Sequence, residues 1–198
     1  MSKTNRSGKA SVISKKQLER FCSNLPVKYS LLAELLYFSS GRIREITTIK
    51  VRNINFKQGL LTLEKSSTKT KQTRQVPIHP ETLQKLKSWI GEHSLQSSDF
   101  VFFTSSRNTK FKAGEKALAT QSIDRKFREA FDWIGLSGCS SHSFRRSRLN
   151  HLLKEGWDLT EIQHISGHAS LTALQEYLES DKHQTFDKYR ELFKTEAI

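Results

Sequence analysis

The sequence is poor in the residues that mark secreted, metal-bound or membrane-inserted proteins. Only two of its 198 residues are cysteines, and Cys22 and Cys139 lie far apart, outside any spacing typical of zinc ligands. No disulfide framework, metal or other cofactor is therefore expected, and a cytoplasmic location fits best. The longest apolar run, residues 29–38, contains Glu34 and is about half as long as a bilayer span. Membrane insertion is not expected, and no apolar segment follows the basic N-terminus as it would in a secretory signal.

Proline and glycine are also scarce, with three and nine residues, which argues against a fibrous or low-complexity chain. The hydrophobic content of 35% and charged content of 27% are those of an ordinary globular protein. Acidic residues are the other deficit, because 20 of them face 33 lysines and arginines, for a net charge of +13. Such an excess indicates a phosphate backbone, an anionic membrane surface or an acidic protein as partner, without choosing among them.

The hydrophobic pattern predicts an α+β fold that is mainly α-helical with a small three-stranded antiparallel sheet. Residues 1–13 are polar, basic and aperiodic and are expected to form a flexible tail, followed by one domain over residues 14–180 and a C-terminal helix over 181–198. Apolar residues recur at helical spacing in 14–24, 26–38 and 80–93, in a short stretch from about 45 to 51, and almost continuously from 119 onward. Capping signals at Asp158 and Ser170, and a stop at Gly167, divide that last region.

Between the second helix and the helix at residue 80, the period of the pattern changes to two. Residues 53–56 and 60–64 predict a hairpin around the turn residues 57–59, and residues 74–78 predict a third strand beyond a polar loop. Residues 99–103 form a short apolar piece that is expected to be a buried strand.

Two pairs of residues could bind an anion on local grounds. His142 and Arg145 lie three apart on a predicted helix and therefore share a face. Arg42 follows Gly41 at a helix junction that can present a side chain to a cleft, and Glu45 comes three residues later. Each pair also has an ordinary explanation, a solvated basic helix in the first case and a surface ion pair in the second.

Two further features could move protons or attack a substrate. Lys69 lies in a basic loop between two strands, where a flexible lysine suits a proton donor, although such loops are usually just solvated. His168 follows Gly167 at a helix end, and Tyr177 comes nine residues later. A lone tyrosine on an apolar helix face is more often a core residue than a nucleophile.

The order and spacing of these features closely resemble the phage integrase family of tyrosine recombinases, over residues from about 15 to 195. The segments that carry the resemblance are Gly-Arg-Ile-Arg-Glu-Ile at 41–46, Thr-Lys-Thr at 68–70 with Val-Pro-Ile at 76–78, His-Ser-Phe-Arg-Arg at 142–146, Ser-Gly-His at 166–168 and Gln-Glu-Tyr at 175–177. The resemblance implies a tyrosine recombinase catalytic-domain fold and a site-specific recombinase that cleaves and rejoins DNA without a metal.

The resemblance also implies a role for each residue. Arg42, Arg145 and His168 would bind the non-bridging phosphate oxygens, where charge grows in the transition state. Tyr177 would attack phosphorus to give a 3′-phosphotyrosyl intermediate. A phenol, with a pKa of about 10, is a weak nucleophile at neutral pH, so help is needed. His142 would be its base or orienting acceptor, Lys69 the general acid for the leaving 5′ oxygen, and Glu45 an accessory residue that orients the arginine cluster.

In such recombinases four protomers bind two DNA duplexes and exchange strands through a Holliday junction. We therefore expect double-stranded DNA as partner, a homo-tetramer on DNA and a monomer without it, possible accessory DNA-bending proteins, and work at the nucleoid. An apolar stripe in residues 181–198 fits a helix that docks into a neighbouring protomer, or one that folds back on its own domain; it consists of Phe186, Tyr189, Leu192 and Phe193. No N-terminal core-binding domain is expected, since some 14 residues precede the first predicted helix.

Two other functions remain open at this point. A type IB topoisomerase uses a similar set of residues to relax supercoils, and a non-catalytic DNA-binding regulator could retain the motifs as relics. Relaxed circles without recombinants would indicate the first, and the absence of any covalent DNA adduct would indicate the second.

Overall fold

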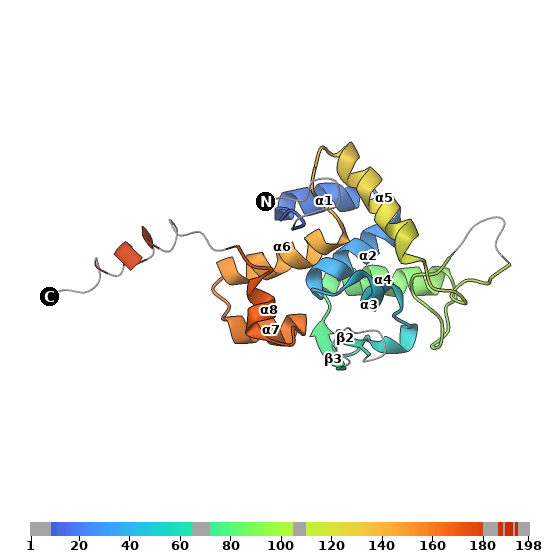
Figure 1. The fold of residues 1–198 in the computed structure, drawn as a ribbon. Coiled ribbons are helices and arrows are strands. Elements are labelled where there is room, and N and C mark those ends of the chain that lie inside the picture. The colour runs from blue at the N-terminus through green and yellow to red at the C-terminus, as the bar shows by residue number, and fades with distance from the viewer. Residues whose placement is uncertain are drawn as a thin grey trace.

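The computed structural model describes residues 9–64, 72–104, 110–179, 186–187, 189–191 and 193. Helices make up most of the body, and a small sheet lies at one edge of it (Figure 1). The α-helices are α1 (Lys15–Ser23), α2 (Val27–Phe38), α3 (Ile43–Thr47), α4 (Pro80–Glu92), α5 (Thr120–Trp133), α6 (Ser141–Lys154), α7 (Leu159–Ser166) and α8 (Leu171–Gln175). One 3₁₀ turn, η1 (Val51–Asn53), leads into the sheet.

The sheet has the predicted three antiparallel strands, β1 (Ile54–Asn55), β2 (Leu60–Leu63) and β3 (Arg74–Pro77), in the order β1-β2-β3. Leu61 pairs with Ile54 on one side and Val76 on the other, and all three side chains are buried. The residues between β2 and β3 include 65–71, which lie outside the described part of the chain, and Lys69 is among them.

The ends of the helices follow the capping signals in the sequence. Ser14 begins α1 with a capping box to Gln17, and Asp158 begins α7 with one to Glu161. Gly167 ends α7 in the left-handed conformation, with φ of 66°. Ser170 caps α8, as expected.

Four local predictions differ from the structure. Residues 11–13 are packed rather than part of a free tail, because Ile13 is buried and its amide donates to Ser147 Oγ. The helix expected over 45–51 is α3, which begins at Ile43 and ends at Thr47. In the segment 99–103, residues 101–103 are buried as expected, but the segment forms only isolated bridges, Lys50 with Phe100 and Phe103 with Ala117. Tyr177 lies in a turn beyond α8, not on a helix face.

Two hydrophobic clusters meet along α6. The larger contains α1, α2, the sheet, α4 and α5, and α6 contributes Phe144 to it. The smaller lies between α6, α7 and α8 and contains Leu149, Leu152, Ile162 and Leu174. Residues of α6 between Phe144 and Leu149 therefore lie at the seam of the two clusters, where buried side chains from several elements converge.

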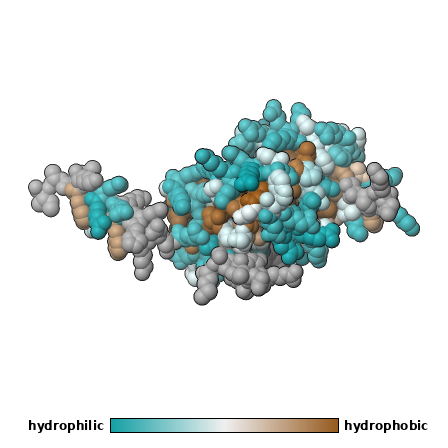
Figure 2. Space-filling view, turned by 90° about the horizontal axis from the view of Figure 1, so that it is seen from above, coloured by the Kyte–Doolittle hydropathy of each residue, from teal (hydrophilic) through white to brown (hydrophobic). Residues whose placement is uncertain are grey.

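The outer surface is mostly hydrophilic, and a hydrophobic strip interrupts the face seen from above (Figure 2). The described residues near the C-terminus lie apart from the body and expose Phe186, Tyr189 and Phe193 (Figures 1 and 2). Leu192, the fourth residue of the predicted stripe, lies outside the described residues. Among the described residues, no helix combines the length and apolar character that crossing a membrane requires.

Candidate active site

The turn that follows α2 prepares the site. Ser39 Oγ donates to the Leu35 carbonyl and accepts from the Gly41 amide, which folds the chain tightly at the helix end. Ser40 has φ of 49°, and a Cβ at Gly41 would lie 2.7 Å from Ile46 Cδ1 and 2.8 Å from Ser39 Oγ, so a side chain there would force these neighbours to shift. The turn thereby places Arg42 at the start of α3 and turns the Ser40 carbonyl toward α6.

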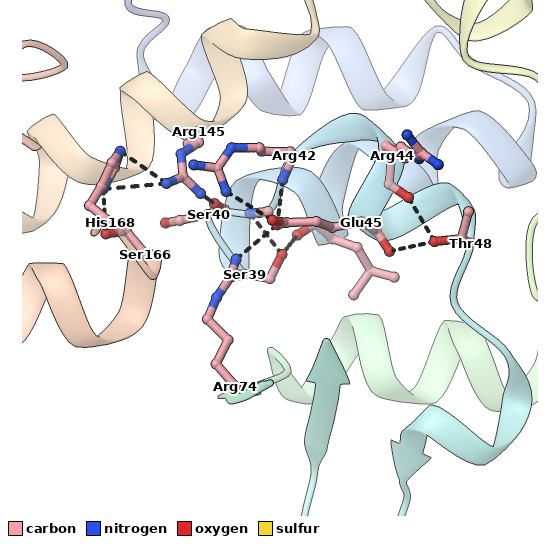
Figure 3. A network of polar contacts seen from close by, with 12 residues as sticks. Ser39, Ser40, Arg42, Arg44, Glu45, Thr48, Arg74, Arg145, Ser166 and His168 are labelled. Carbon is pink, nitrogen blue, oxygen red and sulfur yellow. Dashed lines mark hydrogen bonds and ion pairs between the residues drawn. The ribbon is translucent and has the colours of Figure 1, made fainter. Parts of the chain in front are cut away.

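Glu45 binds two arginines from different elements (Figure 3). Its Oε1 lies 2.9 Å from Arg42 Nη1, and its Oε2 lies 3.0 Å from Arg74 Nη2 and accepts from the Arg42 amide. The Glu45 side chain is fully buried. Burial alone would raise its pKa, but the hydrogen bond and charge of Arg74, with Arg42, outweigh burial and hold the pKa of Glu45 below its usual value. Glu45 is therefore an ionised anchor for both guanidiniums.

Arg74, which the sequence interpretation treated only as the start of a strand, is a third arginine of this cluster. Its guanidinium lies against Gly167, where a Cβ would come within 2.9 Å of Arg74 Cδ. Its Nε and Nη1 are buried without a hydrogen-bond partner among the described residues. The sequence did hold a signal: Arg74 is two residues before the buried Val76 and pairs with the buried Leu63, so a charged residue occupies the inward face of the sheet.

Arg145 lies at the seam of the two clusters and is 1% exposed. Its Nη1 donates to the Ser40 carbonyl, and its Nη2 lies 3.0 Å from Nε2 of His168. Burial, followed by the charges of Arg42 and Arg74, lowers the pKa of Arg145. No described carboxylate lies within ion-pair distance of it, and its Nε has no described partner. A buried guanidinium in this condition is suited to an external anion.

His168 is held at the end of α7. Its Nδ1 lies 2.7 Å from Ser166 Oγ, and its carbonyl accepts from Gln163 Nε2 at 3.0 Å. Burial, then the charges of Arg145, Arg42 and Arg74, lowers the pKa of His168 to about 3. The imidazole is therefore neutral at physiological pH in this arrangement.

Tyr177 lies beside these two residues. Its ring is 4.9 Å from the His168 ring, centroid to centroid, and Arg145 Cζ lies 5.6 Å from the Tyr177 ring centroid. His142, at the exposed start of α6, lines a cavity of about 300 Å³ together with Tyr177 and Arg146.

The structure thus brings together six of the seven predicted site residues, and the seventh, Lys69, lies outside the described residues. The site combines three guanidiniums with one buried carboxylate, so it has an excess of positive charge. Within the described ranges no group of three or more histidine, cysteine or acidic side chains could hold a metal ion. The arrangement can bind an anion such as a phosphodiester and places a phenol next to it.

Comparison with known proteins identifies relatives. A model of the phage integrase family matches residues 12–184. The tyrosine recombinase XerA of Pyrococcus furiosus is 30% identical over 151 residues, covering 76% of this chain and 50% of that protein. The tyrosine recombinase XerC of Chlamydia caviae is 35% identical over 144 residues, covering 71% of this chain and 43% of that protein. The chain therefore spans about half the length of these curated relatives, or less.

Solved structures share the fold. The crystal structure of XerA recombinase superposes with a TM-score of 0.75 at 20% identity, covering 93% of this chain and 66% of that one. The XerH site-specific recombinase in a post-cleavage complex with palindromic difH substrate gives a TM-score of 0.73 at 21% identity, covering 96% and 55%. The predicted fold, mainly α-helical with a small antiparallel sheet, is confirmed.

Proposed function

This chain belongs to the phage integrase family of tyrosine recombinases, and on that premise we propose that it cleaves and rejoins double-stranded DNA at specific sites. Tyr177 Oη attacks a backbone phosphorus and forms a 3′-phosphotyrosyl bond, while the 5′ oxygen of the DNA leaves. The covalent bond keeps the energy of the broken linkage, so that a 5′ hydroxyl can reverse the step and rejoin a strand. The observation that carries the proposal is the buried pair of Arg145 and His168 in ring contact with Tyr177.

Arg42 and Arg145 bind the non-bridging oxygens of the phosphate, and His168 is a third donor to them. Attack on phosphorus increases the negative charge on these oxygens, so fixed donors in a buried site favour the transition state over the ground state. Arg145 supports this role because it is buried without a described carboxylate. Since the guanidiniums supply the positive charge, the proposed reaction needs no metal ion.

Two proton transfers complete the reaction. His142 accepts or orients the phenolic proton of Tyr177, which is supported by the cavity that both residues line. Lys69, from the loop between β2 and β3, protonates the leaving 5′ oxygen. Glu45 contacts no reacting atom in this mechanism; it is a positioning residue that holds Arg42.

The proposed assembly is a tetramer on two DNA duplexes that exchanges strands through a Holliday junction, with a monomer in the absence of DNA. The net charge of +13 supports a DNA partner, and a DNA substrate places the work at the nucleoid. Residues 181–198 are proposed to dock as a helix on a neighbouring protomer, because their described aromatic residues, Phe186, Tyr189 and Phe193, are each more than half exposed. DNA-bending proteins are possible accessories.

The test uses nicked duplexes that tile the DNA flanking the gene and carry a label at the 5′ end of the nicked strand. A nick just downstream of the cleavage site lets the short fragment that bears the new 5′ hydroxyl diffuse away, which traps the 5′-labelled strand on the protein. We expect a labelled adduct that survives SDS, forms in EDTA, and is absent with Tyr177→Phe. Tyr29→Phe is the matched control, because Tyr29 packs partly buried on the larger cluster away from the site.

Each outcome has a meaning. An adduct with Tyr177→Phe, or none with the unaltered chain on any duplex, contradicts the proposal. An adduct that forms only with added Mg²⁺ contradicts the metal-free mechanism. Supercoiled plasmid with two copies of the identified site then separates recombinants, which we expect, from relaxed circles alone, which would indicate a topoisomerase.

A further inference from the structure

The contact between Ser166 and His168 has no role in the proposed cleavage mechanism. Ser166 is the last residue of α7 and is fully buried, and its Oγ lies 2.7 Å from His168 Nδ1 (Figure 3). Gly167, in the left-handed conformation, turns the chain so that His168 folds back over the helix end. The hydroxyl is thus fixed against one nitrogen of the imidazole, while the other faces Arg145.

The contacts of His168 with Arg145 and Ser166 determine which imidazole nitrogen carries the proton. A guanidinium can only donate, so Nε2 of His168, 3.0 Å from Arg145 Nη2, accepts with its lone pair. The proton of the neutral imidazole is then on Nδ1 and donates to Ser166 Oγ. The Ser166 hydroxyl in turn donates to the Gln163 carbonyl at 3.3 Å. Arg145 also lies 3.3 Å from Nδ1, but Ser166 is the closer partner of that atom.

A bound phosphodiester requires the opposite arrangement. Its oxygens only accept, so Arg145 turns its donors to the phosphate, and Nε2 must carry a proton in order to donate as well. Nδ1 of the neutral ring then becomes an acceptor in a buried place, where a polar atom without a partner is costly. A hydroxyl can serve both arrangements by rotating about its Cβ–Oγ bond, whereas a carboxylate, a carbonyl or a methyl group cannot.

We propose that Ser166 is a positioning residue that lets His168 exchange tautomers, from Nδ1–H in the arrangement with Arg145 described above to Nε2–H when a phosphate is bound. The exchange conserves protons, because water delivers one proton to Nε2 and takes up one from Nδ1. The inference rests on the proposed function, since it assumes that the anion in this site is a phosphodiester.

His168 has charged or titratable neighbours on every element packed against it. Arg145 faces it from α6, Arg42 and Glu45 from the start of α3, Arg74 from β3, and Tyr177 from the turn beyond α8. Among the described residues that contact the ring, two carry a group that can both donate and accept without a change of charge, namely the hydroxyls of Ser166 and Tyr177. Tyr177 must remain available for attack, which leaves the exchange to Ser166.

The first experiment reads the tautomer directly. Protein labelled with ¹⁵N-histidine is titrated with inorganic phosphate, against sodium chloride at equal ionic strength, and the His168 signals are assigned from the His168→Gln spectrum. We expect Nδ1–H without phosphate and Nε2–H at saturation. The proposal is overturned if Nε2–H is present from the outset, or if saturating phosphate leaves the His168 signals unchanged.

The second experiment measures single-turnover adduct formation on a nicked duplex that the unaltered chain has been found to cleave. Ser166→Ala should slow it about tenfold, the effect expected from one lost buried hydrogen bond, and the phosphate-dependent change of tautomer should become incomplete. Ser166→Cys, similar in size with a weaker donor, should fall between. Ser147→Ala is the matched control: Ser147 is equally buried and also donates to a main-chain carbonyl of its own helix, that of Ser143, but it lies on the side of α6 that binds Ile13.

The two failures can be told apart. If the unaltered chain forms no adduct on any duplex, the proposed function fails, whatever the NMR experiment shows. If it forms the adduct, and Ser166→Ala forms it equally fast with the unaltered tautomer response, only the role of Ser166 is refuted.

Discussion

Asn150 fastens the main chain of Tyr177 to α6 of the same molecule. Its Nδ2 donates to the Tyr177 carbonyl at 3.0 Å, and its Oδ1 accepts from the Glu179 amide at 2.7 Å. Arg146 adds an ion pair with Glu179 at 3.2 Å. These contacts fix the chain at Tyr177 and two residues beyond it. They place Tyr177 beside Arg145 and His168 of its own chain, so in the proposed mechanism a single protomer supplies both the phosphate-binding residues and the phenol.

Asn150→Ala should therefore slow adduct formation more than it destabilises the fold. The substitution leaves the partly buried Tyr177 carbonyl and Glu179 amide without their partner, which costs about 1–3 kcal/mol for each group that water does not reach. It also frees the turn, and a shift of about 1 Å in a reacting group can cost a hundredfold in rate. We expect adduct formation to fall by about 10- to 100-fold in single-turnover assays, with folding followed by urea unfolding.

Asn53→Ala provides the control for this prediction. Asn53 is also buried and also caps local main chain, through Oδ1 to the Lys50 amide, but it belongs to η1, away from Tyr177. It should lose stability without a matching loss of cleavage rate. If both variants lose rate in proportion to stability, Asn150 acts only as a structural residue.

Much of the fold could be predicted from the sequence because its signals are local. Ser14, Asp158 and Gly167 mark helix ends through side-chain and backbone geometry within a few residues. The errors arose where the outcome depends on contacts between distant segments. Val101 and its neighbours look like a strand, yet they find only isolated bridge partners, and Ile13 is fixed by Ser147 from a helix far along the chain.

The sequence pointed to Arg42, Arg145 and Tyr177 because residue type and order suggest their chemistry, and the structure places Arg145 next to Tyr177. The site was not predictable where the role depends on what a side chain meets in space. The strand pattern puts Arg74 on the inward face of the sheet but does not say what it meets there, and nothing in the local sequence of α6 marks Asn150. Their contacts with Glu45, Gly167 and Tyr177 arise only from the packing of distant segments.

Gly167→Ala should separate backbone strain from damage to the site. At φ of 66° any Cβ costs about 1–2 kcal/mol, and at this position the Cβ would also lie 2.9 Å from Arg74 Cδ. Gly135→Ala is the control, because Gly135 has φ of 74° and nothing within 4 Å of its added Cβ. Both variants should lose similar stability in urea unfolding, but only Gly167→Ala should reduce adduct formation, by at least about tenfold. Equal cleavage by the two variants would contradict a role for the Arg74 approach.

Arg74→Met should destabilise the fold most near neutral pH, where Glu45 is ionised, and should thereby make the protein unfold at a higher pH in acid. Breaking one arm of a buried ion pair can cost about 3 kcal/mol, although Arg42 still compensates part of the Glu45 charge. The lowered pKa of Glu45 contributes stability that is present above the usual carboxyl pKa and is lost as the pH falls through the lowered value, because the unfolded state then binds more protons. Removing Arg74 raises that pKa, so the acid unfolding midpoint should move to higher pH.

Urea unfolding at a series of pH values measures this effect, and Arg52→Met is the matched control. Arg52 pairs with Glu64 at 3.8 Å with about half of its side chain exposed, so its removal should change stability by less than about 1 kcal/mol. An acid midpoint that moves equally in both variants would argue against a special role for the buried pair.

The neutral His168 should make stability depend on pH in a second, higher window. An ordinary imidazole has a pKa of about 6.5, but burial and the nearby guanidiniums lower the pKa of His168 to about 3. Between these two pH values the unfolded chain binds a proton at this residue and the folded chain does not. The free energy of unfolding is therefore highest above about pH 6.5 and declines as the pH falls toward 3. His168→Gln should flatten this slope, most clearly above pH 4.5, where carboxyl groups contribute little. His164→Gln, on the exposed side of α7, should not.

Inorganic phosphate should weaken the same slope in the unaltered chain, because its negative charge offsets the guanidiniums that lower the pKa of His168. His151, whose pKa burial also lowers, keeps a share of the slope in every variant, so the informative quantity is the difference from the unaltered chain. If His168→Gln leaves the slope unchanged, His168 is already protonated in the folded state, and the conclusion that its imidazole is neutral would be wrong.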